Sequence, residues 1–342
     1  MAQGMSKRTR LVTGLVVLTI GMLLPSLLAR ALDHPVIAAA IFMPVMAGML
    51  PTVLGGARIA LISVPVLVVA SGLAVVGHGN AILAGVVMGA TSLAFGLSCR
   101  SGANKFLVMV PITVGFIVCV PPNLATDVTA NVGFVALVTL VGSLWGVGLG
   151  WVVTRRSTHQ SPEPEAWSRT WAYAITLALL TGLAAAVSIA TNWGHAGGWF
   201  VLTVVVVFQP YLRVAAQKTF QRAGGTVVGV GIALVIDFVV PWTPVKAIIG
   251  AALFPIAIVI LIKPQYPYWA YTAVLTPGIV LLEGAATSIA ITAGSRLAAT
   301  FAGVALSLVA VVVLAPLYRH YTGGAPDTAA PNRSDADPAA SQ

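Results

Sequence analysis

Two arginines in the second half of the sequence begin the same short pattern. Arg222 opens the stretch RAGGTVVG and Arg296 opens RLAATFAG, so that each arginine is followed one helical turn later by a threonine, Thr226 or Thr300. A guanidinium group pairs with a carboxylate through charge-assisted hydrogen bonds, and a threonine hydroxyl can donate one more. These four residues therefore predict a binding site for a small organic anion.

The elements that position these residues are predicted to be membrane helices. The chain has 342 residues, of which 58% are hydrophobic and 8% charged, whereas a soluble domain is about 25% charged. Apolar runs between polar, glycine and proline breaks predict about twelve transmembrane helices. Their expected positions are 11–28, 35–50, 58–77, 80–98, 106–121, 133–153, 171–190, 198–212, 222–240, 244–262, 268–283 and 294–315. The predicted fold is an all-α polytopic membrane protein.

The distribution of basic residues predicts the orientation of these helices. With the N-terminus inside, every lysine and arginine except Arg30, Lys246 and Arg296 falls on the cytoplasmic side. Because positive residues gather in cytoplasmic loops, the net charge of +9 reflects membrane topology and gives no reason to expect nucleic-acid binding. We therefore predict that both termini are cytoplasmic.

The two halves show the same order of segments, which predicts two six-helix repeats in parallel orientation. The predicted third helix begins at Arg58 in the first half and at Arg222 in the second, and His34 and His195 fall in matching outer loops. We divide the chain into a first repeat at 1–153, a short cytoplasmic linker at 154–170, a second repeat at 171–320 and a disordered cytoplasmic tail at 321–342.

The first predicted helix also has features of a signal peptide. The basic run KRTR at 7–10 precedes it, and the small-residue pattern ARA at 29–31 follows it. We expect the helix to be retained as a true span, because 171–190 is its counterpart in the second half. Cleavage is the alternative and leaves eleven spans in the same orientation.

A finer repeat lies inside the second half. Three predicted helices separate Arg222 from Arg296, so the two motifs begin on opposite sides of the membrane. This predicts an inverted three-plus-three arrangement, in which each member contains a helix interrupted by proline and a helix that carries the motif.

The motif residues also have structural interpretations. The alternative for Arg222 is a side chain that snorkels to the inner headgroups, whereas Arg296 violates the charge rule and favours a substrate contact. Helix packing and anion binding are equally supported for the two threonines. We assign Gly225, Gly229 and Gly303 to close helix packing, since small residues let membrane helices approach each other.

Four acidic residues fall at the outer ends of predicted helices: Asp33, Asp127, Asp237 and Glu283. Asp237 lies inside the apolar run GIALVIDFVVPW, on the same predicted helix as Arg222. An ionisable residue near membrane depth is by default a candidate functional residue. We therefore predict that Asp237 carries the proton in coupled transport, with solvation at the headgroup level as the alternative for all four acids.

The stretch WGHAGGWFVLTVVVVFQPYLRVAAQKTFQRAGGTVVGVG at 193–231 resembles the fusaric acid resistance (FUSC) and aromatic acid exporter membrane proteins. The shared features are a Trp-containing apolar helix that ends near Gln-Pro, a basic inner segment, and an arginine before Gly-Thr-x-x-Gly. The motif at Arg296 is similar. The resemblance implies a bacterial inner-membrane exporter, driven by the proton motive force, for aromatic or other organic acids.

We therefore predict an exporter of small organic anions that exchanges them for protons, with the lipid bilayer, the anion and protons as its partners. The sequence contains no phosphate loop, nucleophile elbow or paired metal-binding histidines, so we expect no enzyme activity, catalytic residue, metal or cofactor. A passive organic-anion channel and a non-transporting membrane component of an envelope assembly are the alternatives. Whether the chain forms a homo-oligomer stays open.

Overall fold

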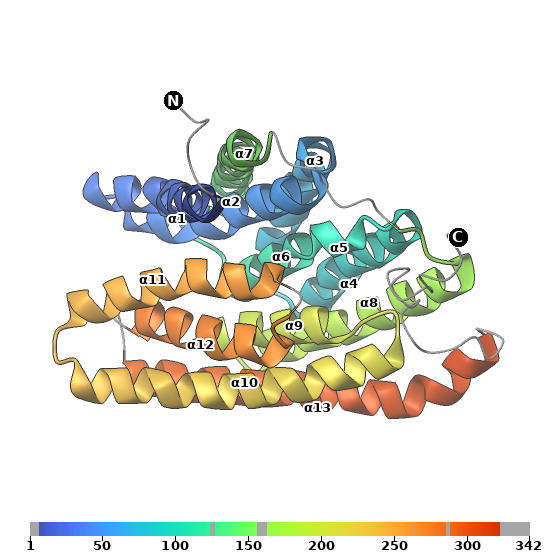
Figure 1. Cartoon of the computed structure of the whole chain (residues 1–342). Coiled ribbons are helices and arrows are strands. Elements are labelled where there is room, and N and C mark those ends of the chain that lie inside the picture. The colour runs from blue at the N-terminus through green and yellow to red at the C-terminus, as the bar shows by residue number, and fades with distance from the viewer. Residues whose placement is uncertain (1–6, 124–126, 156–162, 264, 285–287, 322–342) are drawn as a thin grey trace, which may run out of the picture.

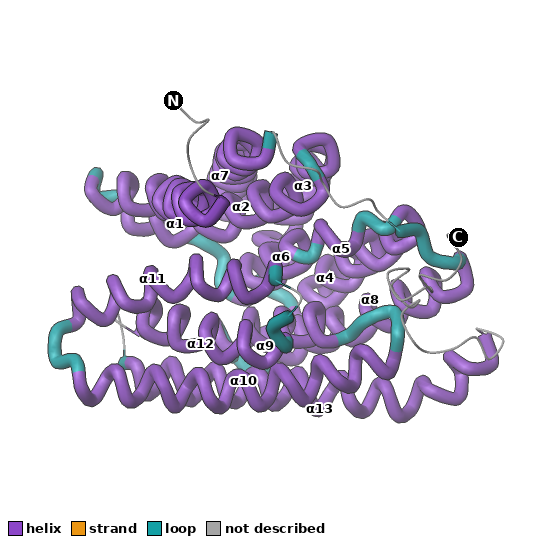
Figure 2. Tube along the Cα trace, in the orientation of Figure 1, coloured by secondary structure: helices purple, strands orange, loops and turns teal. Residues whose placement is uncertain are grey.

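The computed structural model describes residues 7–123, 127–155, 163–263, 265–284 and 288–321, and the described residues are helices joined by loops and turns (Figures 1 and 2). The first half contains α1 (Lys7–Ala31), α2 (Pro35–Gly55), α3 (Ala57–Gly77), α4 (Ala81–Leu97), the 3-10 helix η1 (Ser98–Ser101), α5 (Asn104–Leu107), α6 (Met109–Cys119) and α7 (Val128–Thr154). The second half contains α8 (Trp167–Ala190), α9 (His195–Val207), α10 (Leu212–Val239), α11 (Thr243–Ile262), α12 (Tyr268–Gly284) and α13 (Ile289–Tyr321).

Each of the twelve predicted spans corresponds to a helix in these ranges, and the short elements η1 and α5 come before the fifth. Within the described residues, eight helices are long and apolar enough to cross a membrane. The prediction of an all-α, multi-pass membrane protein is therefore confirmed. The division into two six-helix repeats stays a prediction, and the predicted tail lies outside the described residues from 322 onward.

Helix α9 is short because the chain leaves the helical conformation ahead of Pro210. Proline disfavours helical geometry in the residue before it, and Phe208 has an extended conformation with φ −74° and ψ 121°. The side-chain amide nitrogen of Gln209, Nε2, donates hydrogen bonds to the backbone carbonyl oxygens of Val206 and Phe208. The carbonyl groups of Val206, in the last turn of α9, and of Phe208, just beyond its end, therefore both have a donor.

In the second half, α10 and α13 lie side by side and run in opposite directions (Figure 1). Helix α10 also packs along α12, and α13 packs along α9. Each helix that carries an arginine motif thus contacts the helix that precedes the other motif. This exchange of contacts fits the predicted inverted arrangement of α8–α10 and α11–α13.

The motif glycines lie at these helix contacts. A Cβ atom added to Gly225 would overlap the Thr272 hydroxyl and lie 2.5 Å from the carbonyl oxygen of Trp269. A Cβ atom on Gly303 would lie 2.7 Å from Thr203 Cβ. Gly229 meets α12 in the same way, at Thr276 and Pro277. All three positions require a residue without a side chain.

Helix α1 is part of the bundle of the first half. It packs against α2 and α7, and its Met22 side chain is buried. The indole nitrogen of Trp145 on α7 donates a hydrogen bond of 2.8 Å to the carbonyl oxygen of Gly21. Helix α1 thus packs as part of the bundle, and its retention as a span stays a prediction.

The two halves meet along α4 and α8 and along α6 and α9. The end of the linker contacts both halves. Glu165 accepts a hydrogen bond of 2.9 Å from the Tyr211 hydroxyl and forms an ion pair with Arg169 at 3.4 Å. Glu163 pairs with Lys105 at 2.7 Å, and this ammonium group holds the pKa of Glu163 below its usual range. The linker thus contacts both halves.

Candidate functional site

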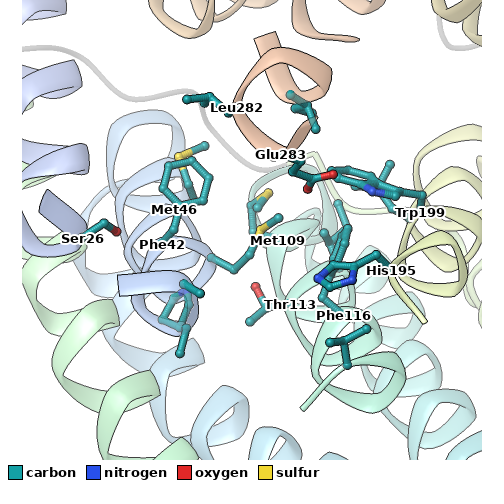
Figure 3. Close-up of a pocket in the computed structure, with 18 of the residues that line it drawn as sticks. Ser26, Phe42, Met46, Met109, Thr113, Phe116, His195, Trp199, Leu282 and Glu283 are labelled. Atoms are coloured by element: carbon teal, nitrogen blue, oxygen red, sulfur yellow. The ribbon is translucent and has the colours of Figure 1, made fainter. Parts of the chain in front are cut away.

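A cavity of about 840 Å³ lies between the two halves. Helices α1, α2 and α6 form its wall in the first half, and α9, α10, α11 and α12 form its wall in the second half (Figure 3). Most of the lining is apolar. The titratable or hydrogen-bonding side chains among the described lining residues are Ser26, Thr113, Asn123, His195, Trp199, Arg222, Tyr271 and Glu283.

Arg222 lines this cavity from α10. The helix begins at Leu212, earlier than predicted, so Arg222 lies about 15 Å along the helix axis from its start. Its side chain is 2% exposed, and Nη1 donates a 3.3 Å hydrogen bond to the Tyr268 hydroxyl. Its Nε has no hydrogen-bond partner within the described ranges. A guanidinium group this deeply buried does not fit the snorkelling interpretation.

Arg296 lies behind the cavity wall, on α13, with 1% of its surface exposed. Its guanidinium carbon lies 3.6 Å from the centroid of the Trp199 ring, which is a close cation–π contact. Nε, Nη1 and Nη2 find no hydrogen-bond partner in the part of the chain that the structure describes. Arg296 also interacts electrostatically with Arg222. A positive charge in this state favours a nearby anion.

Trp199 connects Arg296 to an acidic residue. Its ring contacts the guanidinium group, and its indole N–H donates a hydrogen bond to the Glu283 carboxylate (Figure 3). The ring of Phe116 on α6 packs against it edge to face, with centroids 4.6 Å apart. His195, at the start of α9, also interacts electrostatically with Glu283. Residues from three second-half helices thus form one polar cluster at an apolar cavity.

Comparison with known protein families identifies this region. Residues 174–310 match the family described as fusaric acid resistance protein-like. Residues 174–310 are a fusaric acid resistance protein-like region. It spans every residue of the polar cluster, and it confirms the resemblance seen in the motif sequences. No curated protein and no solved structure gave a significant match.

Within the fusaric acid resistance protein-like region, the four predicted anion ligands have different positions. Arg222 lines the cavity, and Arg296 is one aromatic ring away from it. Thr226 is fully buried outside the lining, and its hydroxyl has no partner among the described residues. Thr300 is also buried outside the lining. The structure therefore places Arg222 in the cavity lining and Arg296 directly behind it, against the Trp199 ring, and places neither threonine in the lining.

Asp237, the predicted proton carrier, lies elsewhere in this region. It forms an ion pair with Lys246 between the C-terminal end of α10 and the start of α11. Neither residue lines the cavity. Asp237 thus has a cationic partner of its own, whereas Glu283 belongs to the cavity.

The sequence favoured Asp237 over Glu283 as the proton carrier. A usable signal was present. Glu283 ends one predicted helix on the outer side, and Arg296 begins the next predicted helix on the same side. Consecutive antiparallel helices bring such residues close together. The indole ring between them could not be found this way, because it comes from α9.

The family match and the membrane-length helices together describe a multi-pass membrane protein of the transporter type.

Proposed function

We propose that the protein is a secondary transporter that exports small organic anions, aromatic acids among them, through the cavity between its halves. The observation that supports this is a buried guanidinium group, Arg222, in the lining of a mostly apolar cavity, with a second, Arg296, directly behind its wall. Burying an unpaired charge is unfavourable, and a carboxylate is the natural partner of a guanidinium group. An incoming carboxylate would bind at Arg222, and the positive charge of Arg296 would stabilise it from behind the Trp199 ring.

The rest of the cavity suits the apolar body of such an acid. Phe42, Met46 and Met109 line its first-half wall, and Phe254 lines it from α11. Ligand pockets of about 300–1,000 Å³ hold small organic molecules, mostly against apolar side chains. Methionine side chains adapt to irregular shapes. The cavity of about 840 Å³ is therefore large enough for an aromatic acid.

The membrane arrangement completes the proposal. We propose that the protein lies in the bacterial inner membrane as two six-helix repeats, with both termini cytoplasmic. We also propose that its transport is coupled to the proton motive force. Thr226 and Thr300 are left out of the anion site, because they do not line the cavity. We propose no catalytic chemistry.

Flux through reconstituted protein tests this function. Proteoliposomes loaded with benzoate should release it faster than protein-free vesicles, and Arg222→Ala should slow the release at least about tenfold, since one good charge-assisted pair is lost. Lys263→Ala, a basic residue outside the cavity lining, is the control. If release is unchanged in both Arg222→Ala and Arg296→Ala, the proposal is wrong. Channel-scale currents in a planar bilayer would instead favour passive conduction.

A further inference from the structure

Glu283 is the acidic group of the proposed anion site. Its carboxylate accepts a hydrogen bond from Trp199 and interacts electrostatically with Arg296 on α13 and His195 on α9. Within the described lining, α2, α6 and α11 contribute no titratable group to the cavity, while α10 contributes Arg222 and α12 itself also contributes Tyr271. Glu283 therefore interacts with one arginine, one histidine and one tryptophan, and Arg222 and Tyr271 line the same cavity.

The charges of this cluster depend on the protonation of Glu283. When Glu283 is ionised, its carboxylate offsets the positive charge of Arg296, while Arg222 lines the same cavity. A substrate carboxylate that enters then meets a negative charge as well as the two positive ones. Repulsion between like charges is strong where the surroundings exclude water. A proton on Glu283 removes this repulsion and leaves both arginines to the substrate.

We propose that Glu283 is the proton-binding residue of the anion site, and that a proton on Glu283 and an organic carboxylate at Arg222 and Arg296 are bound together. This rests on the proposed function, and it assigns the sense of the coupling. Proton and anion favour each other's binding, so the carrier moves both in the same direction. Export then follows the outward gradient of the acid, because protons that enter down the proton motive force would carry the anion inward. An exchange of anion for proton, as predicted from the sequence, requires that they exclude each other.

The structure also indicates how the proton reaches this residue. His195 is exposed at the start of α9 and lines the same cavity. An imidazole ring can both accept and donate a proton, so His195 can pass a proton between water and Glu283. Asp237 has no comparable position, because it pairs with Lys246 away from the cavity. Asp237 therefore provides a matched control.

Linkage makes the proposal measurable in two independent ways. If a proton on Glu283 raises the affinity for an anion by some factor, the bound anion raises the proton affinity of Glu283 by the same factor. Anion affinity must then increase as the pH falls, and anion binding must take up protons from the buffer. Both effects require the carboxyl group of Glu283.

The experiment is calorimetric titration of benzoate into the full chain in lipid nanodiscs, in buffers of different ionisation enthalpy. Benzoate stays ionised between about pH 6 and pH 8, since simple carboxylic acids titrate near pH 4. We expect binding about tenfold tighter at the lower pH, together with proton uptake. Glu283→Gln should bind at pH 8 as tightly as the wild type does at pH 6, without proton uptake. Asp237→Asn should behave as the wild type.

The outcomes separate the two proposals. Benzoate binding that does not change with pH, or proton uptake that persists in Glu283→Gln, overturns the assignment of Glu283 and leaves anion transport standing. Binding that weakens as the pH falls overturns the sense of the coupling and favours exchange. Wild-type protein that binds no benzoate at either pH, while remaining folded by circular dichroism, overturns the proposed function and this inference with it.

Discussion

The guanidinium group of Arg296 lies 3.6 Å from the centroid of the Trp199 ring, on a helix that the chain reaches only after three further helices. The same indole donates its N–H to Glu283. One side chain on α9 therefore holds a cation against its ring and an acid at its edge. This geometry fixes the distance between the two groups on which both proposals depend.

Two substitutions of Trp199 should distinguish the contribution of its contact with Arg296 from that of its hydrogen bond to Glu283. Trp199→Leu loses both and should destabilise the protein by about 2 kcal/mol, the size of a desolvated cation–π contact. Trp199→Phe keeps a ring face and should cost less, but it loses the hydrogen bond to Glu283. Thermal unfolding in detergent measures the stability. Trp269→Leu, at the matching position on α12 but exposed, is the control, and equal losses at both positions would contradict the assignment.

The close contact of α10 with α12 predicts a sharp difference between neighbouring glycines. Gly225→Ala places a methyl group against the Trp269 carbonyl oxygen and the Thr272 hydroxyl. Overpacking of this kind destabilises by about 1–3 kcal/mol. Gly224→Ala meets no atom within 4 Å, so it should leave the unfolding temperature unchanged or slightly higher. Thermal unfolding of the two variants checks this, and similar values for both would show that the helices are not in tight contact.

The helices were predictable, because an apolar segment of membrane length must satisfy its backbone hydrogen bonds internally, and an α-helix does this within one segment. The start of α10 was not. The segment LRVAAQKTFQ before Arg222 contains Arg213, Lys218 and two glutamines, and this polarity indicated a cytoplasmic loop. Because the segment is helical, it carries Arg222 into the bundle. Hydropathy alone cannot detect a helix that continues through a polar stretch.

The residues at the cavity were predictable only in part. The repeated motif identified Arg222 and Arg296 because both stand in the same local sequence pattern. The partners of these arginines come from other helices, so no spacing along the chain indicates them. Asp237 was preferred to Glu283 for its apolar neighbours, although an apolar sequence environment does not exclude an ion pair with Lys246 across a short connection.

The ion pair between Asp237 and Lys246 should contribute to stability and not to transport. Asp237→Asn leaves Lys246, whose side chain is 12% exposed, without its partner. We expect a loss of about 1 kcal/mol, because the pair is partly exposed to solvent. The double variant Asp237→Asn with Lys246→Gln should recover most of this loss. Benzoate flux in proteoliposomes should stay at the wild-type value in both, and a loss of flux in Asp237→Asn alone would return the proton-binding role to Asp237.

Replacing the buried arginines should change stability and anion binding in opposite directions. Arg296→Met removes a buried charge whose three nitrogens have no partner within the described residues, and replacing buried charges with apolar groups of similar volume stabilises proteins by about 1–4 kcal/mol. Arg222→Met should stabilise the protein less, because this variant also loses the hydrogen bond that Arg222 donates to the Tyr268 hydroxyl. Both variants should nevertheless lose benzoate binding, as measured by calorimetry beside thermal unfolding. If Arg296→Met instead unfolds at a lower temperature and binds benzoate normally, Arg296 has a structural role, and the anion site must be assigned to Arg222 alone.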